Sequence, residues 1–426
     1  MRHVLKNQEN IDLEIIIGKI LDEIINMQDM VSIIVPTLNG LKYLEQVMDS
    51  VQKHTKWPFE VIVVDNCSVD NTGDLIVKYQ KNMDIKRIYL PKNETRSHAR
   101  NAGIASARGD IIIFSDSDMI SERDYVTKHM EANVGNNDVI CGENWVKIYT
   151  FYYKDFLGYL KRNLLINKHL YNLSTPMNKI EDKSCLINEE KIISGEYKKF
   201  SFTYAVNDHG YQIILDRYGR NLEGYKFPWS FFVTNNCSAR REKILEAGMF
   251  DEDYKGWGCE DLDLGYRLYK KGCNFKKLDI ESIHQEHAIN YMEDGLKNIY
   301  YFSEKYNSVD VLLYYFHNLI TLDINSANEI VKEIESIEHI EDYKIILYLF
   351  KDLLRAARNN KYSDLIDKTS LIQELKSLKE NVGYNRELLR RLCTEILEQY
   401  KCVKLISALK NLIKYMLRIN FDDLSF

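Results

Sequence analysis

Two aspartates at alternate positions, Asp116 and Asp118, are the residues of this chain best suited to carry chemistry. They follow the apolar run Ile111–Phe114, which has no helical period and is typical of a strand buried on both faces, as in a parallel sheet. Ionised carboxylates just past a buried strand are costly unless a cation or hydrogen-bond donors meet them. We therefore expect the pair to face a hard metal ion and the phosphates that it would carry. A solvated turn is the alternative.

Polar residues also end two earlier apolar runs, so the candidate site draws on several strands. Val31–Val35 is closed by Pro36–Asn39, and Val61–Val64 runs into Asp65 and Asn66. Apolar runs that alternate with helical segments predict a doubly wound α/β sheet. Because the strand ends of a parallel sheet share one edge, we expect these polar residues to lie near the aspartate pair. No glycine-rich dinucleotide motif or P-loop is present.

A second stretch with chemical potential is Gly256–Asp261, which reads GWGCED. Its glycines allow the backbone to turn sharply and approach a ligand closely. Trp257 between them offers a flat apolar face of the kind that sugars pack against. Glu260 and Asp261 fall at the predicted start of a helix, where the helix dipole favours ionised carboxylates. Such a carboxylate, aimed at a cleft, is a candidate general base; a helix start decorated with acids is the alternative.

Taken in order, these stretches resemble glycosyltransferase family 2. The resemblance covers about residues 30 to 290 and is carried by Val31–Asn39, Val61–Asp70, Arg100–Gly103, Asp116–Asp118 and the block from Phe227 to Glu286. The run FDEDYKGWGCEDLDLGYRLYKKGC looks especially like the bacterial chondroitin-type polymerases, and it is similar to the G-W-G-G-E-D motif of β-1,4-galactosyltransferases. The resemblance implies the GT-A fold, an α/β doubly wound mixed sheet.

The resemblance also implies a role for each matching residue. It implies a metal ion, Mn²⁺ or Mg²⁺, on Asp118, Asp116 and His284. Contacts to the sugar-nucleotide donor are implied for Pro36, Thr37, Asn39, Asp65, Asn66, Arg100, Asp116, Ser117 and Asn236. Acceptor contacts are implied for Trp257, Gly258 and Glu260, with Asp261 as the catalytic base and Glu260 beside it.

Three positions need comment. Many family members have Asp-Asp where this chain has Asp65-Asn66, which leaves the choice of uridine over another base open. Cys259 replaces the last glycine of G-W-G-G, so the acceptor loop can differ. Of the two histidines His284 and His287, the match to the family favours His284 as the ligand.

These residues predict a metal-dependent, inverting hexosyl- or N-acetylhexosaminyltransferase that uses a UDP-sugar and a glycan hydroxyl, in surface polysaccharide or glycoconjugate synthesis. A divalent cation would stabilise the leaving diphosphate, and one base that takes the acceptor's proton permits a single displacement. The chondroitin-type enzymes carry two such modules and this chain shows one, so the resemblance does not predict a polymerase. Lipid-linked, peptide or protein acceptors, a nucleotidyltransferase that makes sugar nucleotides, and a non-catalytic sugar-binding protein are the alternatives.

Composition limits the remaining possibilities. The 426 residues are 45% hydrophobic, enough for more than one domain. A net charge of −6 gives no basic footprint for nucleic acid. Eight cysteines without C-x-x-C pairs, no signal peptide and no apolar run long enough to span a bilayer predict a cytoplasmic protein with reduced thiols. Peripheral contact with the inner face of the membrane is an alternative.

The chain is predicted to have three parts. Residues 1–29 hold an N-terminal amphipathic helix at Ile11–Met27, and residues 30–300 form the GT-A domain, with 144–226 as an excursion beside the site. Residues 301–426 are an all-α region. Its helical segments are expected at Val311–Ile320, Asn328–Glu338, Ile340–Arg358, Ser370–Lys379 and Arg386–Arg418. Within the last of these, Lys401–Arg418 is amphipathic and basic, which suits packing in a bundle, self-association or a membrane surface.

Overall fold

The computed structural model describes residues 29–54, 56–133, 135–152, 162, 184–203, 205–287, 292–318, 322–361 and 368–418. The predicted helix at Ile11–Met27 lies outside these residues. The chain divides into two compact units. The first comprises Met1–Asp208, Phe232–Glu252 and Arg267–Ile289, and the second comprises His209–Phe231, Asp253–Tyr266 and Asn290–Phe426. The second unit therefore combines the helical C-terminal region with two segments taken from residues 30–300.

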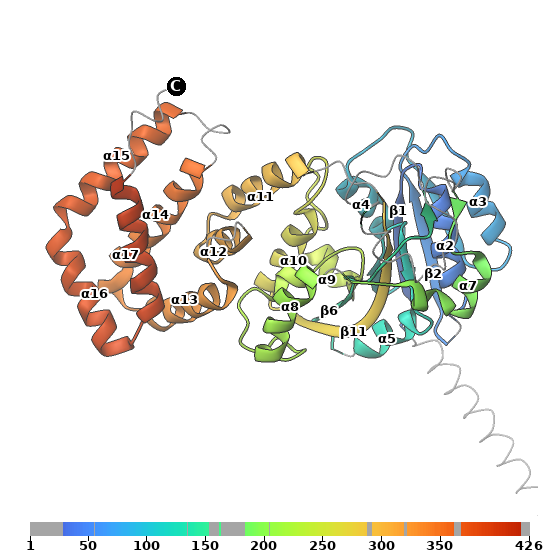
Figure 1. Ribbon diagram of the computed structural model, residues 1–426, viewed down its shortest axis with the longest axis horizontal. Helices are drawn as coiled ribbons and strands as arrows, with labels where there is room; N and C mark the ends of the chain where they lie inside the picture. The colour runs from blue at the N-terminus through green and yellow to red at the C-terminus, as the bar shows by residue number, and fades with distance from the viewer. Residues whose placement is uncertain are drawn as a thin grey trace, which may run out of the picture. The chain divides into compact units, whose positions relative to one another are not determined.

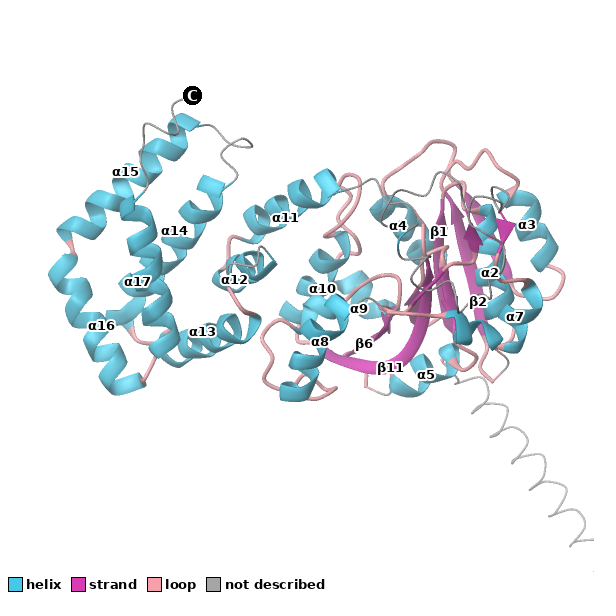
Figure 2. Cartoon of the chain, in the orientation of Figure 1, coloured by secondary structure: helices cyan, strands magenta, loops and turns pink. Residues whose placement is uncertain are grey.

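The first unit is built on a nine-stranded mixed sheet (Figures 1 and 2). In it, β1 (Val31–Thr37) pairs in parallel with β2 (Phe59–Asp65) and β4 (Ile111–Phe114), and β2 pairs in parallel with β3 (Ile85–Tyr89). Beyond β4 come β10 (Cys237–Arg240), β6 (Asp138–Glu143), β11 (Asn274–Gln285) and β5 (Met119–Ser121), with β7 (Lys147–Ile148) beside β11. A separate ribbon joins β8 (Phe151–Tyr152) to β9 (Ser184–Cys185). Because β10 runs antiparallel to both of its neighbours, the sheet is mixed.

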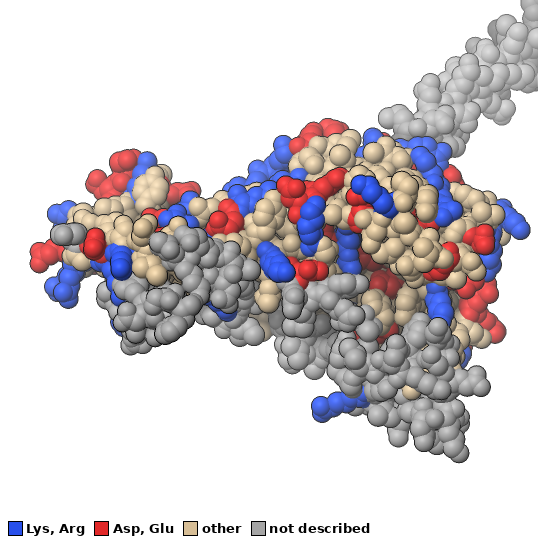
Figure 3. All heavy atoms as spheres, turned by 90° about the horizontal axis from the view of Figure 1, so that it is seen from above, with Lys and Arg blue, Asp and Glu red and all other residues tan. Residues whose placement is uncertain are grey.

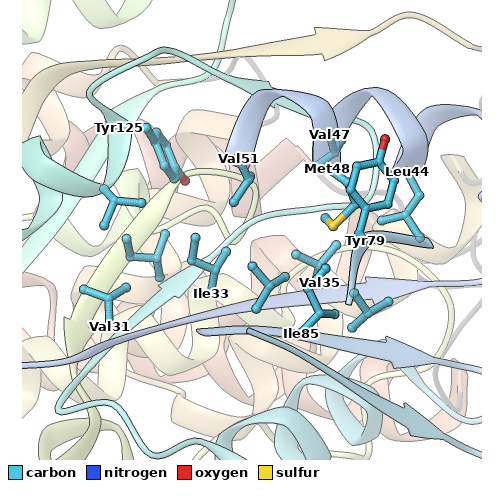
Figure 4. Packing of buried hydrophobic residues seen from close by; sticks show 14 of the residues in the cluster. Val31, Ile33, Val35, Leu44, Val47, Met48, Val51, Tyr79, Ile85 and Tyr125 are labelled. Atoms are coloured by element: carbon cyan, nitrogen blue, oxygen red, sulfur yellow. The ribbon is translucent and has the colours of Figure 1, made fainter. Parts of the chain in front are cut away.

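Helices cover both faces of the parallel part of this sheet. Val31, Ile33 and Val35 of β1 belong to a buried cluster with residues of α2 (Leu41–Val51), α3 (Thr72–Tyr79) and α5 (Tyr125–Ala132) (Figure 4). Ile34 and Val64 lie against Gly103 of α4 (Arg96–Ser106) instead. Two-sided burial explains why β1, β2 and β4 read as continuous apolar runs rather than as alternating ones. The predicted α/β mixed sheet is confirmed.

The sequence after Asn236 forms a strand before it forms a helix. β10 occupies Cys237–Arg240, and α9 runs over Arg241–Glu246. Ala239 is fully buried, with β4 on one side and β6 on the other. The sequence CSAR of β10 has little intrinsic preference for strand, so the two neighbouring strands decide its conformation.

The second unit is mainly helical, as predicted for the C-terminal region. Its helices are α11 (Met292–Tyr306), α12 (Val309–Asn318), α13 (Ile324–Ile337), α14 (Lys344–Lys361), α15 (Lys368–Tyr384), α16 (Arg386–Tyr400) and α17 (Val403–Arg418). The segment expected as one helix over Arg386–Arg418 is two helices, because Lys401 adopts a left-handed conformation (φ +57°) between them.

The apolar face of α17 is used for packing. Leu405, Ile406 and Leu409 are at most 1% exposed, and α17 packs on α13 and α14. Bundle packing therefore accounts for the amphipathic pattern without a membrane surface. None of the helices among the described residues combines the length and apolar character needed to cross a lipid bilayer. Acidic and basic side chains are interspersed over the described part of the face in Figure 3, in keeping with the absence of a basic footprint in the composition.

Candidate active site

The loops that follow β1 and β2 are hydrogen-bonded to each other at the carboxyl edge of the sheet. Asn39 N donates to Ser68 Oγ (2.9 Å), and Val69 N donates to Asn39 Oδ1 (2.8 Å). Leu41 N, at the start of α2, donates to Asp70 Oδ2 (3.1 Å). These hydrogen bonds hold the two loops together, and Asn39 takes part in two of them.

Gly40 allows the loop after β1 to lie close to the turn at Asp116–Asp118, the aspartate turn. A Cβ atom at Gly40 would lie 2.5 Å from Thr37 Oγ1 and 3.2 Å from Ser117 Oγ, so only glycine allows the approach. Thr37, just after Pro36, is buried, and Ser117 between the two aspartates is half-buried. The residues expected at the ends of β1 and β4 are thus neighbours.

Asp65, expected to contact the nucleoside, is fully buried and bonded within the protein. Its Oδ2 accepts hydrogen bonds from Arg87 Nη2 (2.5 Å) and Nε (3.1 Å), and its Oδ1 accepts one from Ser68 N (2.9 Å). A paired arrangement of this kind fixes both position and charge. Asp65 therefore joins β2 to β3 and shapes the loop, and a direct contact with the donor stays a prediction.

Asn66 has a structural reason to be an amide. Its Nδ2 donates to Asn93 Oδ1 (3.0 Å) and to Glu94 O (2.9 Å), and its Oδ1 accepts from Glu94 N (2.9 Å). These bonds tie the β2 loop to the segment that leads into α4. Asn66, which stands where many members of the resembled family have Asp, is therefore held by an amide network within the protein.

We expect Asn66→Asp to lower the free energy of unfolding by about 2 kcal/mol, because a carboxylate would face two acceptor oxygens, one of Asn93 and one of Glu94, in a site that is only 7% exposed. Urea denaturation of the two proteins measures the difference. Asn82→Asp, an exposed amide-to-acid change in the same unit, is the control and should change stability by less than about 0.5 kcal/mol. Equal stability of Asn66→Asp and the parent chain would contradict this account.

Arg100 and Asp116 form an ion pair at the turn. Arg100 Nη2 lies 2.9 Å from Asp116 Oδ1, and the side chain of Arg100 is only 3% exposed. Its guanidinium carbon lies 5.6 Å from the centre of the Phe250 ring. A buried, stacked guanidinium holds its partner in one orientation. Arg100 therefore fixes the position of Asp116, as well as being a candidate for contact with the donor.

The strongest candidate for a metal site is the group Asp118, His284 and His287, whose ligand atoms all lie within 4.8 Å of one another. Asp118 Oδ2 is 2.9 Å from His287 Nε2 and 3.6 Å from His284 Nε2. Asp118 Oδ1 is buried and has no hydrogen-bond partner among the described residues. A buried carboxylate oxygen without a donor is costly, and a cation held beside two imidazoles would satisfy it. These residues fit a divalent metal ion.

Burial raises the pKa of Asp118, but the charges of His284 and His287 outweigh burial and lower it to about 2. The carboxylate is therefore ionised at neutral pH. His284 is held from its other side, because its Nδ1 lies 3.1 Å from Glu286 Oε1. A carboxylate on the far nitrogen of a ligating histidine fixes the ring and its tautomer. Glu286, only 6% exposed, is thus a positioning residue for His284.

The sequence interpretation chose His284 over His287 and placed Asp116 with Asp118 on the metal, and these assignments stay predictions. Among the described residues, the candidate metal group contains both histidines and Asp118, whereas Asp116 faces Arg100. The signal for His287 was its spacing from His284: β11 ends at Gln285, and the chain turns so that both imidazoles reach Asp118.

Asn236 holds strands together inside the sheet. Its Nδ2 donates to Glu143 O (2.7 Å) and Ile280 O (2.8 Å), and its Oδ1 lies 3.1 Å from His129 Nε2. The side chain is 1% exposed, and both amide hydrogens are used. Both N–H groups of the Asn236 amide are therefore engaged inside the sheet, and its predicted contact with the sugar nucleotide stays a prediction.

The residues expected to bind the acceptor belong to the second unit. Trp257 is 44% exposed, and α10 (Glu260–Lys270) begins at Glu260, as predicted. Glu260 is buried and Asp261 is half-buried. Burial and the charge of Asp261 raise the pKa of Tyr211 to about 12. Tyr211, which the sequence interpretation missed, is therefore a neutral phenol in the field of the Asp261 carboxylate.

Known protein families match two parts of this chain. The family model described as Glycosyl transferase family 2 matches residues 32–184, and the one described as N-terminal domain of galactosyltransferase matches residues 218–290. An uncharacterized glycosyltransferase of Bacillus subtilis, YfnE, is 35% identical over 333 residues, which cover 77% of this chain and 83% of that protein. The chondroitin synthase of Pasteurella multocida is 26% identical over 259 residues, which cover 60% of this chain and 24% of that protein.

Among solved structures, S. aureus TarS 1–349 in complex with UDP-GlcNAc aligns over 91% of this chain and 92% of that chain, with 16% identity and a TM-score of 0.41. The relationship itself rests on the matched family models and on the similarity to the B. subtilis protein along most of both chains. The chain belongs to glycosyltransferase family 2.

Proposed function

We propose that this chain transfers a hexosyl or N-acetylhexosaminyl group from a UDP-sugar to a hydroxyl of a growing glycan, with inversion at the anomeric carbon. The observation that carries the proposal is the Asp118, His284 and His287 group at the carboxyl edge of the sheet, where open α/β sheets bind ligands. The matched relatives support a glycan as acceptor, since two of them are named as a chondroitin synthase and a teichuronic acid biosynthesis glycosyltransferase.

The donor set of this group, two imidazoles and one carboxylate, suits Mn²⁺ well and Mg²⁺ less well. A divalent cation held there would stabilise the negative charge that develops on the leaving diphosphate. Asp118 supplies an ionised carboxylate for it, and Glu286 keeps His284 Nε2 directed at Asp118. Arg100 and Asp116 add a fixed ion pair beside the same turn.

Asp261 is proposed to take the proton of the acceptor hydroxyl as that oxygen attacks the anomeric carbon. Its place in the first turn of α10 favours the ionised carboxylate. One base is sufficient for a single displacement, which inverts the configuration, whereas a retaining mechanism through a covalent intermediate needs a second carboxylate as nucleophile.

The proposed donor predicts selective stabilisation by UDP. With Mn²⁺ present and UDP at about 100 times its dissociation constant, the protein should gain about 2.7 kcal/mol of stability, because the ligand binds only the folded state. Thermal unfolding with UDP, GDP, CMP and dTDP at equal concentration is the measurement. The largest shift is expected with UDP, and turnover of UDP-sugars should accompany it. A larger shift with GDP or CMP would overturn the uridine donor, and equal protection by dTDP would show that the protein does not distinguish uridine from thymidine.

A further inference from the structure

One acidic residue of α10 is buried and held by α11. Asp263, two residues after Asp261, is 0% exposed. Its Oδ1 accepts a hydrogen bond from Lys305 Nζ and one from Tyr306 OH, each at 2.7 Å. Tyr254, in the loop before α10, donates from its hydroxyl to the same oxygen at 3.3 Å. A carboxylate this deeply buried is stable only when it is paired and hydrogen-bonded, and α11 supplies the paired cation.

Lys305 is itself held between aromatic rings. Its Nζ lies 5.8 Å from the centre of the Tyr254 ring and 5.3 Å from the centre of the Tyr306 ring. The side chain of Lys305 is only 26% exposed. The faces of aromatic rings attract a cation, and the attraction grows as the cation loses water. The two rings and the Asp263 carboxylate therefore fix the ammonium at one place, and the ion pair carries no net charge.

Helix α11 also holds the loop that leads into α10. Asn298 Nδ2 donates to Lys255 O at 2.8 Å and to Trp257 O at 3.0 Å, and Asn298 is only 6% exposed. A buried amide that satisfies two backbone carbonyls fixes the path of the chain between them. These contacts and those of Asp263 all lie within the second unit. The start of α10 and the loop before it are therefore both attached to α11.

The residues that make these attachments lie beyond the family matches. The two matched models end at residues 184 and 290, and α11 spans Met292–Tyr306. Membership of the family therefore does not account for Lys305 or Tyr306. Their contacts connect a helix that the family model covers to a helix that it does not cover.

The carboxylates at the start of α10 act on a common point. Burial, and then the charges of Asp261, Glu260 and Asp263, raise the pKa of the Cys259 thiol well above its usual value. Like charges this close disfavour one another's ionisation. Tyr211 also lies in the field of Asp261, but burial and that charge raise its pKa to about 12, so it is neutral. A cation on Asp263 therefore balances one of three repelling charges.

We propose that Lys305 and Tyr306 are positioning residues for sugar transfer, and that they act through Asp263. Both residues hold the first turns of α10 in place. The ammonium of Lys305 also balances the Asp263 carboxylate, so that Asp261 can be ionised and accept a proton. The helical region after residue 290 is then part of the catalytic apparatus rather than an accessory. The inference rests on the proposed function, because Asp261 is the proposed base.

The electrostatic part is tested on Asp261 itself. Carbon-13 NMR of the full chain with labelled aspartate follows the titration of this carboxyl without substrate, and Asp261→Asn identifies its signal. Lys305→Met should raise the titration midpoint by about one pH unit, because Asp263 loses its cation. Asp263→Asn should lower the midpoint by about one unit, because Lys305 loses its anion. The double substitution should return the midpoint to that of the parent chain.

Opposite shifts distinguish charge balance from a loss of structure, which would move the midpoint in one direction or not at all. Lys332→Met is the matched control and should leave the midpoint unchanged. Lys332, in the same unit, is 35% exposed, lies 3.5 Å from Glu329 Oε1 and has its Nζ 5.3 Å from the centre of the Tyr218 ring. Asp263→Asn keeps the size of the side chain, so it tests the role alone where Lys305→Met does not fold. Shifts in the same direction, or no shift in Asp263→Asn, would overturn the electrostatic role.

The attachment to α11 is tested by hydrogen exchange. Tyr306→Phe removes one hydrogen bond to the Asp263 carboxylate and changes no charge, so the peptide that covers Cys259–Leu264 should exchange about tenfold faster. Tyr218→Phe is the matched control, since the buried Tyr218 hydroxyl has no hydrogen-bond partner among the described residues. Unchanged exchange in Tyr306→Phe would overturn the attachment.

Turnover of the same variants separates this inference from the proposed function. The release of UDP from UDP-GlcNAc with Mn²⁺ is measured against pH, and the acid limb of the rate should move with the Asp261 midpoint. Midpoint shifts that the rate does not follow would overturn Asp261 as the base, and with it the role of the ion pair in the reaction. Midpoints that do not shift would overturn the role of the ion pair alone.

Discussion

Asp118→Asn is expected to lose Mn²⁺ binding and UDP-sugar binding together, and to lower turnover by about 10²–10³-fold, the range seen when one electrostatic group of an active site is removed. The amide keeps the shape of the carboxylate but carries no charge, and the buried Oδ1 atom would no longer offer a cation its negative oxygen. Because the pKa of Asp118 is held at about 2, the parent carboxylate is ionised at every pH near neutrality. The loss in the variant should therefore be independent of pH in that range.

Calorimetry with Mn²⁺, and then with UDP in the presence of Mn²⁺, gives the two affinities beside product formation. His287→Gln should weaken Mn²⁺ binding to an extent similar to His284→Gln, because both imidazoles face Asp118. Asp116→Asn is the matched control: it removes a carboxylate from the same turn that is paired with Arg100, and it should weaken Mn²⁺ less than Asp118→Asn. Full activity in excess chelator would remove the metal from the mechanism altogether.

The parts of the fold that were predictable from sequence are those whose burial is two-sided. β1, β2 and β4 lie between helices on both faces, so most of their residues are apolar, and the break into polar residues marks each strand end. The aspartate turn and His284 in β11 were found because they follow such breaks or match a motif. The amphipathic C-terminal helices were found by their period, since each buries one face.

The strands in the second half of the sheet were harder to see. β11 reads NFKKLDIESIHQ, with charged residues between the buried ones, and β6 includes a cysteine and a glycine. Such strands owe their conformation to their neighbours rather than to local propensity. The antiparallel position of β10 between β4 and β6 depends on pairs of residues that are 96 to 129 positions apart in the sequence, which no local pattern records.

The sequence could not show the contacts that some site residues make within the protein, because the partners are distant in sequence. The bonds of Asn236 to His129, Glu143 and Ile280 exist only in the folded sheet, and its predicted contact with the sugar nucleotide stays a prediction. The same holds for Asp65, whose carboxylate is bonded to Arg87 on the adjacent strand. A buried polar side chain is usually satisfied within the protein, and sequence alone does not show which side chains are buried.

Asp261→Asn should nearly eliminate sugar transfer, by about 10²–10⁴-fold, while the affinity for the UDP-sugar changes little. The amide keeps the size and most of the hydrogen bonding of the carboxylate but cannot accept the proton of the acceptor hydroxyl. The loss should therefore appear in turnover and not in donor binding, as expected when an interaction of the transition state is removed. Tyr211→Phe is a second comparison, because the charge of Asp261 acts on the Tyr211 phenol. Removal of the phenol hydroxyl should lower turnover less than removal of the Asp261 carboxylate.

Donor affinity by calorimetry and product formation are measured for Asp261→Asn, Glu260→Gln and the parent chain. Glu260 is the matched control because it is the adjacent carboxylate of the same helix turn, and it is buried where Asp261 is half-buried. Glu260→Gln should mainly raise the acceptor concentration needed for half-maximal rate, since a buried side chain is better placed to orient a hydroxyl or the loop than to exchange a proton with solvent. Near-normal turnover of Asp261→Asn, combined with a large loss in Glu260→Gln, would move the role of base to Glu260. Near-normal turnover of both variants would remove both proposed proton acceptors, Glu260 and Asp261, which are the first two residues of α10.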